Sequence, residues 1–226
     1  MNPPGPDARD AERPLSGGHA RRLVIQAQAF VGAVLGPGDW ALDATVGNGR
    51  DTLFLAGCVG PLGRVYGFDI QPGALEIARQ RLARAGQLAQ TRLMLSDHAL
   101  MAEQLPARCR ESIKGMMMNL GYLPGGDRRI RTRTDSTLEA LGAMRGLLAP
   151  GGRLSLLAYT GHPGGAEEAE AVRGWACALA LRGYAVQPAA PLPGRRSPPL
   201  LICMEKAGAD TCGAGKRPAR ADTVVG

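Results

Sequence analysis

The segment from Leu42 to Thr52 constrains this chain more than any other. It reads Leu-Asp-Ala-Thr-Val-Gly-Asn-Gly-Arg-Asp-Thr, which predicts a buried strand, a glycine turn and the start of a helix. A second predicted strand, Val65 to Asp69, follows about one strand–helix–strand unit later and ends on a carboxylate. A glycine turn lets backbone N–H groups approach a ligand, and an acidic residue at the next strand end accepts hydrogen bonds from a ribose. The sequence therefore predicts a nucleotide-type ligand at these strand ends.

Dinucleotides and S-adenosylmethionine both use this arrangement, and position 52 separates them. A dinucleotide fingerprint requires glycine there, whereas this chain has Thr52 with Asp51 beside it. A carboxylate at a helix N-terminus repels a pyrophosphate but suits the sulfonium or amino group of S-adenosylmethionine. We therefore expect S-adenosylmethionine as the cofactor, and a nicotinamide oxidoreductase is a distant alternative.

The composition fits one domain with an aliphatic core. Of 226 residues, 45% are hydrophobic and only 4% are aromatic. The chain has no apolar run of about 18 residues and no signal segment, so we expect a soluble, cytoplasmic protein without a membrane partner. The 5 cysteines form no CxxC pair and the 3 histidines are scattered, which predicts neither a disulfide framework nor a metal site. The formal charge of +7 fits a polyanionic partner, although this balance is only suggestive.

The chain divides into a proline-rich leader at 1–16, a folded domain at 17–206 and a disordered tail at 207–226. Apolar periodicity and glycine or proline stops predict helices at 19–35, 51–59, 72–85, 100–105, 134–148 and 166–182. Strands are predicted at 40–45, 64–70, 91–96, 113–120, 153–160, 184–188 and 200–206.

This alternation predicts an α/β fold: a doubly wound, mostly parallel, Rossmann-like sheet of seven strands with helices on both faces. The last two strands are joined by a turn-rich connection and are expected to pair antiparallel. Ligands of such sheets bind beyond the carboxyl ends of the strands, and every motif below falls at such an end.

The candidate cofactor-binding residues follow the first three predicted strands. They are Asp43, Gly47, Asn48, Gly49, Asp51, Asp69, Gln71, Asp97 and His98. Simpler structural interpretations stay open for several of them. The glycines could form a tight turn without a ligand, Gln71 could cap the helix that Pro72 begins, and Ser96 or Asp97 could be a helix N-cap.

The candidate catalytic residues are Asn119, Tyr122 and His162. Methyltransferases that act on amines often carry Asn or Asp, two further residues and an aromatic after the fourth strand. The Asn119 oxygen could then accept a hydrogen bond from an amine nitrogen, while Tyr122 closes over the target. His162 could remove a proton, because its ordinary pKa lies near neutrality; a capping or packing role is the alternative.

Four arginines lie next to this segment, at Arg128, Arg129, Arg131 and Arg133. Their position beside the expected active site predicts contact with RNA phosphates. The alternative is a solvated charged loop, and Thr134 or Asp135 could cap the next helix.

On these residues the chain resembles the class I S-adenosylmethionine-dependent methyltransferases. More narrowly, it is similar to a small bacterial rRNA-methylase family that includes the enzymes methylating 5-aminomethyl-2-thiouridine at the tRNA wobble position. The resemblance spans about residues 20–206. The matching segments are residues 43–52, 68–71, 119–127, 161–165 and 198–201, of which Asn-Leu-Gly-Tyr-Leu-Pro-Gly-Gly-Asp at 119–127 is the most specific.

This resemblance implies roles for individual residues. Contacts to the methyl donor are implied for Asn48, Asp51, Asp69, Gln71 and His98, and contacts to the target amine for Asn119, Tyr122 and His162. One departure concerns the substrate side: the family tends to carry asparagines before its Pro-Pro pair, whereas this chain has Arg195-Arg196-Ser197.

We therefore expect an N-methyltransferase that acts on an exocyclic amine of RNA, with a tRNA wobble uridine as the leading substrate. The alternatives are an rRNA or small-molecule methyltransferase, and a non-catalytic RNA-binding protein with a degenerate cofactor pocket. The sequence leaves the oligomeric state open, a homodimer included.

Overall fold

The computed structural model describes residues 17–188 and 198–208. The predicted leader at 1–16 lies outside the described residues, as do residues 189–197 of the last connection and the tail beyond 208. The predictions made for these segments, Arg195-Arg196-Ser197 included, are therefore not addressed by the structure.

Seven strands form one sheet in the order β3-β2-β1-β4-β5-β7-β6. Their bounds are β1 (Trp40–Asp43), β2 (Arg64–Asp69), β3 (Thr91–Leu95), β4 (Ile113–Leu120), β5 (Leu148–Ala158), β6 (Tyr184–Pro188) and β7 (Leu200–Lys206). The pairs among the first five strands are parallel, and β7 is antiparallel to both β5 and β6. The predicted fold class and the antiparallel last pair are confirmed.

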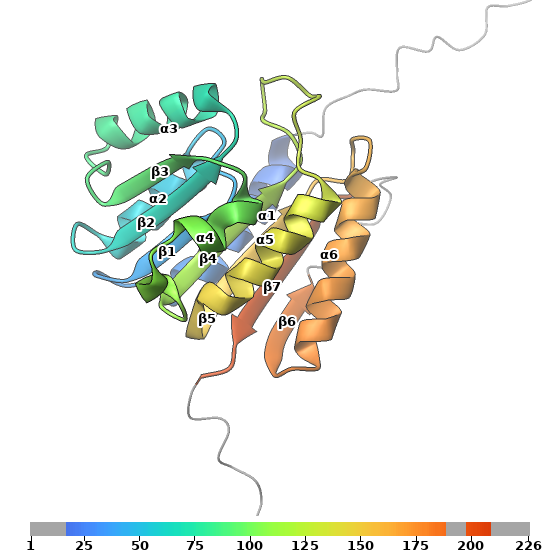
Figure 1. The fold of residues 1–226 in the computed structure, drawn as a ribbon. Helices are drawn as coiled ribbons and strands as arrows, with labels where there is room; N and C mark the ends of the chain where they lie inside the picture. Colours follow the sequence, from blue (N-terminus) through green and yellow to red (C-terminus); the bar gives the residue numbers. More distant parts are fainter. Residues whose placement is uncertain (1–16, 189–197, 209–226) are drawn as a thin grey trace, which may run out of the picture.

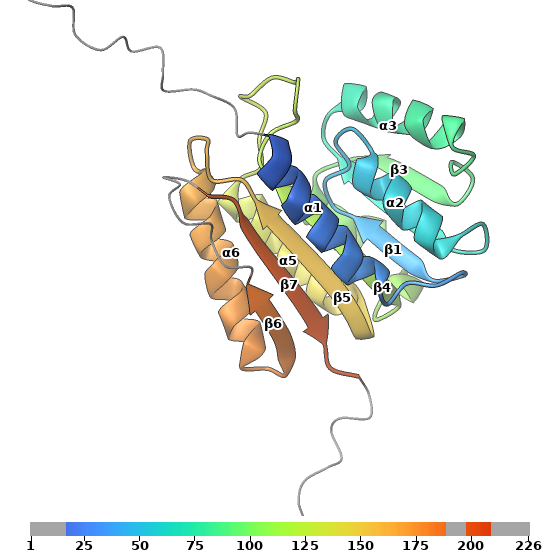
Figure 2. The ribbon, with the colours of Figure 1, turned by 180° about the vertical axis from the view of Figure 1, so that it is seen from behind.

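Helices cover both faces of this sheet. One face carries α1 (Gly17–Gly32), α2 (Arg50–Val59) and α3 (Pro72–Arg84), with α1 and α2 in front in Figure 2. The other carries α4 (Met101–Gln104), α5 (Thr134–Leu147) and α6 (Gly165–Ala180), as Figure 1 shows. Two short 3-10 helices, η2 (His98–Leu100) and η3 (Ala107–Cys109), flank α4. The crossovers leave the carboxyl ends of β1, β2, β3 and β4 at one edge of the sheet.

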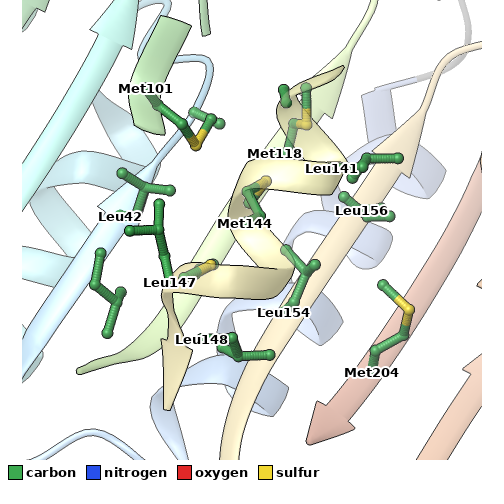
Figure 3. Close-up of a cluster of buried hydrophobic side chains, with 14 of the residues drawn as sticks. Leu42, Met101, Met118, Leu141, Met144, Leu147, Leu148, Leu154, Leu156 and Met204 are labelled. Atoms are coloured by element: carbon green, nitrogen blue, oxygen red, sulfur yellow. The ribbon is translucent and has the colours of Figure 1, made fainter. Parts of the chain in front are cut away.

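The core is aliphatic and sulfur-rich, as the composition predicts. β4 is buried on both faces: Met116 and Met118 pack in the cluster beneath α5, and Met117 packs in the cluster beneath α1 and α2. Figure 3 shows Met118 beside Leu141 and Met144 of α5, with Leu156 of β5 near them. The unbranched methionine side chain fills irregular gaps between strand and helix. Burial of this run on both faces is typical of a central strand, and β4 lies between β1 and β5.

The sequence placed most elements within a few residues, and β5 is the main correction. It begins at Leu148, five residues before the predicted start at 153, and includes the Pro-Gly-Gly at 150–152. The register with β4 shifts from Ile113↔Leu148 to Gly115↔Arg153, so these residues bulge without ending the pairing. The predicted helix at 100–105 is a 3-10 turn followed by the single turn α4. The N-cap position of α5 is Arg133, which makes no side-chain capping bond, and not Thr134 or Asp135.

In the described part of the chain, no helix is both long and apolar enough to cross a membrane. Within residues 17–188 and 198–208, no three His, Cys, Asp or Glu residues gather as metal ligands would.

Candidate functional site

A cavity of about 530 Å³ lies at the carboxyl ends of β1, β2, β3 and β4. Its walls come from the turn after β1, the residues after β2 and β3, the end of β4 with its following loop, and the start of α1. The sequence-predicted residues that line it are Gly47, Asn48, Asp51, Asp69, Gln71, Asp97, His98, Asn119, Tyr122, Arg131 and Arg133. Five others do not line it: Asp43, Gly49, Arg128, Arg129 and His162. The parallel strands therefore bring most of the predicted site together.

The turn after β1 depends on two glycines in the left-handed region. Gly47 has φ 49° and lines the cavity. Gly49 has φ 71° and is buried against α3, where an added Cβ would stand 2.6 Å from the Cβ of Ala78. The Arg81 Nε donates to the Asn48 carbonyl oxygen at 2.8 Å and holds the turn from α3. Gly49 thus serves helix packing, while Gly47 brings backbone to the cavity.

Asp69, at the end of β2, is fixed by two backbone groups. Its Oδ2 accepts from the Gly47 N–H at 2.7 Å and its Oδ1 from the Gln71 N–H at 2.9 Å. Each carboxylate oxygen has a second lone pair, so Asp69 can still accept hydrogen bonds from a ligand in the cavity. Gln71 is the N-cap residue of α3 without a side-chain capping bond, and it lines the cavity.

Asp43 is placed differently from the sequence expectation of a cofactor contact. It is fully buried below the cavity, where it accepts from the Thr52 hydroxyl at 2.6 Å and the Thr45 N–H at 3.1 Å. Burial, followed by the negative charge of Asp51, raises the pKa of Asp43 from 3.8 to about 7. Its geometry supports the turn and the first turn of α2, because both hydrogen bonds end there.

Asp51 and Asn119 form the polar centre of the cavity wall. Asp51 is only 6% exposed, and its Oδ2 accepts from Asn119 Nδ2 at 2.7 Å. The Asn119 N–H donates to the Thr45 hydroxyl at 2.7 Å. In the described part of the chain, neither Asp51 nor Asp69 has a lysine or arginine within ion-pair distance. Carboxylates without a protein cation leave this wall suited to a cationic ligand.

The residues after β3 combine a structural and a lining role. Asp97 is the N-cap of η2, with its Oδ1 accepting from the Ala99 N–H at 2.9 Å, and it also lines the cavity. The capping interpretation is therefore confirmed for Asp97. His98 is 8% exposed, and its buried Nε2 has no hydrogen-bond partner among the described residues. Burial lowers the pKa of His98, so the imidazole is neutral at neutral pH and can bond a ligand.

Tyr122 lies between a cation and an imidazole. The Arg128 guanidinium sits 5.5 Å from the centre of the Tyr122 ring, and the His162 ring meets it edge-on at 6.0 Å. The Nδ1 of His162 lies 3.1 Å from the Pro163 carbonyl, which can only accept, so Nδ1 carries the hydrogen. The Nε2 of His162 is buried and has no partner among the described residues. The His162 ring thus packs against Tyr122, and its Nε2 is left unpartnered in the described structure.

The loop at 121–133 is anchored at its base by Glu168 of α6. This carboxylate is 2% exposed and accepts from the Thr132 hydroxyl at 2.7 Å and the Thr137 hydroxyl at 2.6 Å. Thr132 Oγ1 in turn accepts from the Gly121 N–H at 2.9 Å. The sequence analysis gave Glu168 no role, since a glutamate early in a helix resembles a favourable dipole interaction. Only its burial shows that it holds the loop.

The four loop arginines differ in what they contact. Arg129 pairs with Asp127 at 2.8 Å and Arg133 with Asp135 at 2.7 Å, all on the loop or the start of α5. Arg131 lines the cavity, and no ion pair involves it in the described part of the chain. Arg21 of α1 and Arg50 of α2 also line the cavity. The sequence analysis missed both, because exposed arginines at helix starts carry no distinctive signal.

Known proteins similar to this chain include methyltransferases, which agrees with a cavity suited to a cationic methyl donor. The model of the family described as "Putative rRNA methylase" matches residues 65–205. A curated relative, the chloroplastic tRNA (mnm(5)s(2)U34)-methyltransferase of Arabidopsis thaliana, is 40% identical over 159 residues. That alignment covers 67% of this chain and 57% of the relative's length.

Two solved structures are similar to this chain over almost their whole length. A protein from Clostridium thermocellum described as "putative rRNA-methylase" has 36% identity and a TM-score of 0.76, and the match covers 81% of this chain and 96% of that protein. A protein from Streptococcus mutans described as "a putative methyltransferase", in complex with SAH, has 32% identity and a TM-score of 0.72, and the match covers 82% of this chain and 98% of that protein. SAH is the demethylated form of S-adenosylmethionine, so the Streptococcus mutans neighbour agrees with the cofactor that the sequence predicts.

Proposed function

Because this chain belongs to the family described as "Putative rRNA methylase", we propose that it is an S-adenosylmethionine-dependent N-methyltransferase acting on an exocyclic amine of RNA. The leading substrate is the aminomethyl group of a tRNA wobble uridine, as the name of the Arabidopsis relative suggests. The observation that carries the proposal is the orientation of Asn119 in the cavity wall.

The residues of the cavity fit the methyl donor by their chemistry. Asp69 offers free lone pairs at the strand end where a ribose hydroxyl can donate. Asp51 supplies a negative charge without a protein cation, which suits the sulfonium and amino groups. The unpartnered Nε2 of the buried His98 is left to bond the ligand. When bound, S-adenosylmethionine supplies a methyl carbon made electrophilic by its positive sulfur.

Asn119 would hold the target amine. Its Nδ2 donates to Asp51, so its carbonyl oxygen is available to accept a hydrogen bond from an amine N–H. That bond would turn the nitrogen lone pair away from Asn119 and toward the methyl carbon, which lowers the entropic part of the barrier. The methylated nitrogen must lose one proton. His162 is the proposed acceptor, and because its Nε2 is buried beside Tyr122 and does not line the cavity, Tyr122 must move for the proton to reach it.

The RNA partner is supported by the arginines around the cavity. Arg21, Arg50 and Arg131 come from α1, α2 and the 121–133 loop, and all three line it. RNA phosphates next to the target nucleotide could contact these guanidinium groups, and Arg128, Arg129 and Arg133 extend the basic loop. The cytoplasmic location and the homodimer stay predictions; the Arabidopsis relative is named as chloroplastic.

The decisive experiment incubates the protein with methyl-labelled S-adenosylmethionine and tRNA from a strain that lacks wobble aminomethyl methylation. Nucleoside mass spectrometry should find the label on the 5-aminomethyl-2-thiouridine nucleoside. Parallel reactions contain rRNA or a free amine in place of the tRNA, and label found only in one of these would overturn the tRNA assignment. Absence of binding heat with S-adenosylmethionine in calorimetry would favour a non-catalytic RNA-binding protein instead.

The matched variant is Asn119→Ala. It should lower kcat by at least about 1000-fold, as loss of a group that positions the reacting atom does, while cofactor affinity changes only slightly. Wild-type turnover by this variant would contradict the role given to Asn119.

A further inference from the structure

Asp51 receives hydrogen bonds from two side-chain amides that come from distant parts of the chain. Gln28 of α1 donates from Nε2 to Asp51 Oδ1 at 2.7 Å, and Asn119 of β4 donates from Nδ2 to Asp51 Oδ2 at 2.7 Å. The three residues therefore form a continuous chain of hydrogen bonds, with the Asp51 carboxylate between the two amides. The proposed methyl transfer uses Asn119 and Asp51 and gives Gln28 no role.

The carboxylate determines how both amides are turned. A carboxylate oxygen accepts hydrogen bonds and cannot donate them, so each amide must face Asp51 with its nitrogen. For Asn119, the bond from its backbone N–H to Thr45 Oγ1 fixes the backbone as well. The Asn119 carbonyl oxygen is thereby turned away from Asp51, and no donor among the described residues bonds it.

Gln28 lies behind this arrangement. Ala20, Arg21 and Val24 of the same helix line the cavity, whereas Gln28 does not. Gln28 is half-buried, and its neutral amide donates to Oδ1, the Asp51 oxygen that Asn119 does not use. It therefore restricts rotation of the carboxylate without cancelling its charge. Without this bond, Asp51 could turn and Asn119 could exchange the positions of its amide oxygen and nitrogen.

We propose that Gln28 is a positioning residue, which locks the Asp51 carboxylate so that the Asn119 carbonyl oxygen stays directed to the target amine. Gln28 acts through Asp51 and Asn119 and touches neither substrate nor methyl donor. The proposal rests on the proposed function for the role of Asn119, and its geometric part can be tested separately. A supporting side chain of this kind keeps a reacting group within the narrow range of productive geometry.

The kinetic test uses Gln28→Met, which keeps the length of the side chain and removes its donor. The matched control is Gln26→Met on the same helix, because Gln26 is exposed and has no hydrogen bond in the described structure. For Gln28→Met we expect kcat to fall about 10- to 100-fold, with KM for tRNA and the Kd for S-adenosylmethionine within about threefold of wild type. An unchanged kcat, or an equal fall in Gln26→Met, overturns the proposal.

The second measurement does not depend on turnover. The side-chain NH2 resonances of Asn119 can be identified in a ¹⁵N-labelled protein by their loss in Asn119→Ala. In Gln28→Met these resonances should shift and their hydrogen exchange should accelerate at least about 10-fold, since the bond to Asp51 is no longer held. Gln26→Met should leave them unchanged. Asn119 resonances that are identical in Gln28→Met and wild type overturn the proposal.

The two measurements separate the two hypotheses. If the wild-type protein methylates no RNA, the proposed function fails, and the resonances still decide whether Gln28 holds Asn119. If methylation is found and the Asn119 resonances do not respond to Gln28→Met, only the positioning role fails.

Discussion

The two sides of the cavity are built in different ways. On the side of β1 and β2, the polar atoms are tied to backbone groups or to each other: Asp69 is held by two N–H groups and Asp43 by a hydroxyl and an N–H. On the opposite side, the loop residues at 124–130 are all exposed, and Glu168 and Thr132 hold the loop at its base.

This difference teaches which ligand each side can serve. Acceptors that are already held in place lose little conformational entropy when a small ligand binds, so the strand-end side suits the methyl donor. A projecting basic loop on a firm base can adapt to a larger, flexible polyanion, which fits RNA. The loop is seen above the carboxyl end of β4 in Figure 1. Substitutions on the two sides should therefore have separable effects.

The largest effect is expected in the pH dependence of stability, which depends on Asp43 beneath the side of the cavity built by β1 and β2. Its pKa is about 7 in the folded protein and 3.8 ordinarily, so the folded state retains a proton that the unfolded state has lost between these pH values. The free energy of unfolding should therefore decrease as pH rises from about 4 to about 7, by up to about 4 kcal/mol. Asp43→Asn should remove much of this decrease. Urea denaturation of both proteins across this pH range measures it, and parallel pH profiles would contradict the prediction.

A somewhat smaller effect is expected for Gly49→Ala. The left-handed φ of 71° and the approach to Ala78 both oppose a Cβ at this position. The cost should be about 3 kcal/mol in the free energy of unfolding. Gly57→Ala, inside the helix that follows Gly49, is the control, because nothing lies within 4 Å of a Cβ added at Gly57. That variant should be as stable as wild type or up to about 1 kcal/mol more stable.

Asp69→Ala tests the cofactor side directly. Loss of its hydrogen bonds should weaken S-adenosylmethionine binding by about 1–3 kcal/mol, measured by calorimetry, and leave tRNA affinity unchanged. Glu76→Ala removes an equal charge from the exposed face of α3 and should not change cofactor binding. A comparable loss of tRNA affinity in Asp69→Ala would break the division between the two sides.

The smallest effect distinguishes two arginines of the loop. Arg131 lines the cavity without an ion pair in the described structure, whereas Arg129 is occupied by Asp127. Arg131→Ala should weaken tRNA binding by about 1 kcal/mol and reduce the salt dependence of log K by about 1, and Arg129→Ala should do less. Filter binding at several salt concentrations measures both. Equal slopes for the two variants would show that intraloop pairing does not select the RNA contacts.

The sequence predicted the strand ends of this site well because parallel strands obey a simple rule. A residue that follows a buried strand in a doubly wound sheet lies at the ligand edge, whatever the helices between strands look like. Asp69, Asp97 and Asn119 were therefore found from local pattern alone, and the cavity brings them together. The same rule does not say whether a strand-end side chain lines the cavity or is buried away from it. Asp43 is fully buried and does not line the cavity.

The sequence itself determined the fold class and the order of elements, since hydrophobic periodicity and glycine turns act over a few neighbouring residues. The family followed from the resemblance of segments such as 119–127 and from the match of the family model. Only the tertiary structure decided that Gln28 reaches Asp51, that Glu168 holds Thr132, and that Arg21 and Arg50 line the cavity. These contacts join residues dozens of positions apart, or helices to a site at the sheet edge. Helix packing and burial bring such pairs together, and the sequence around either residue does not predict these long-range contacts.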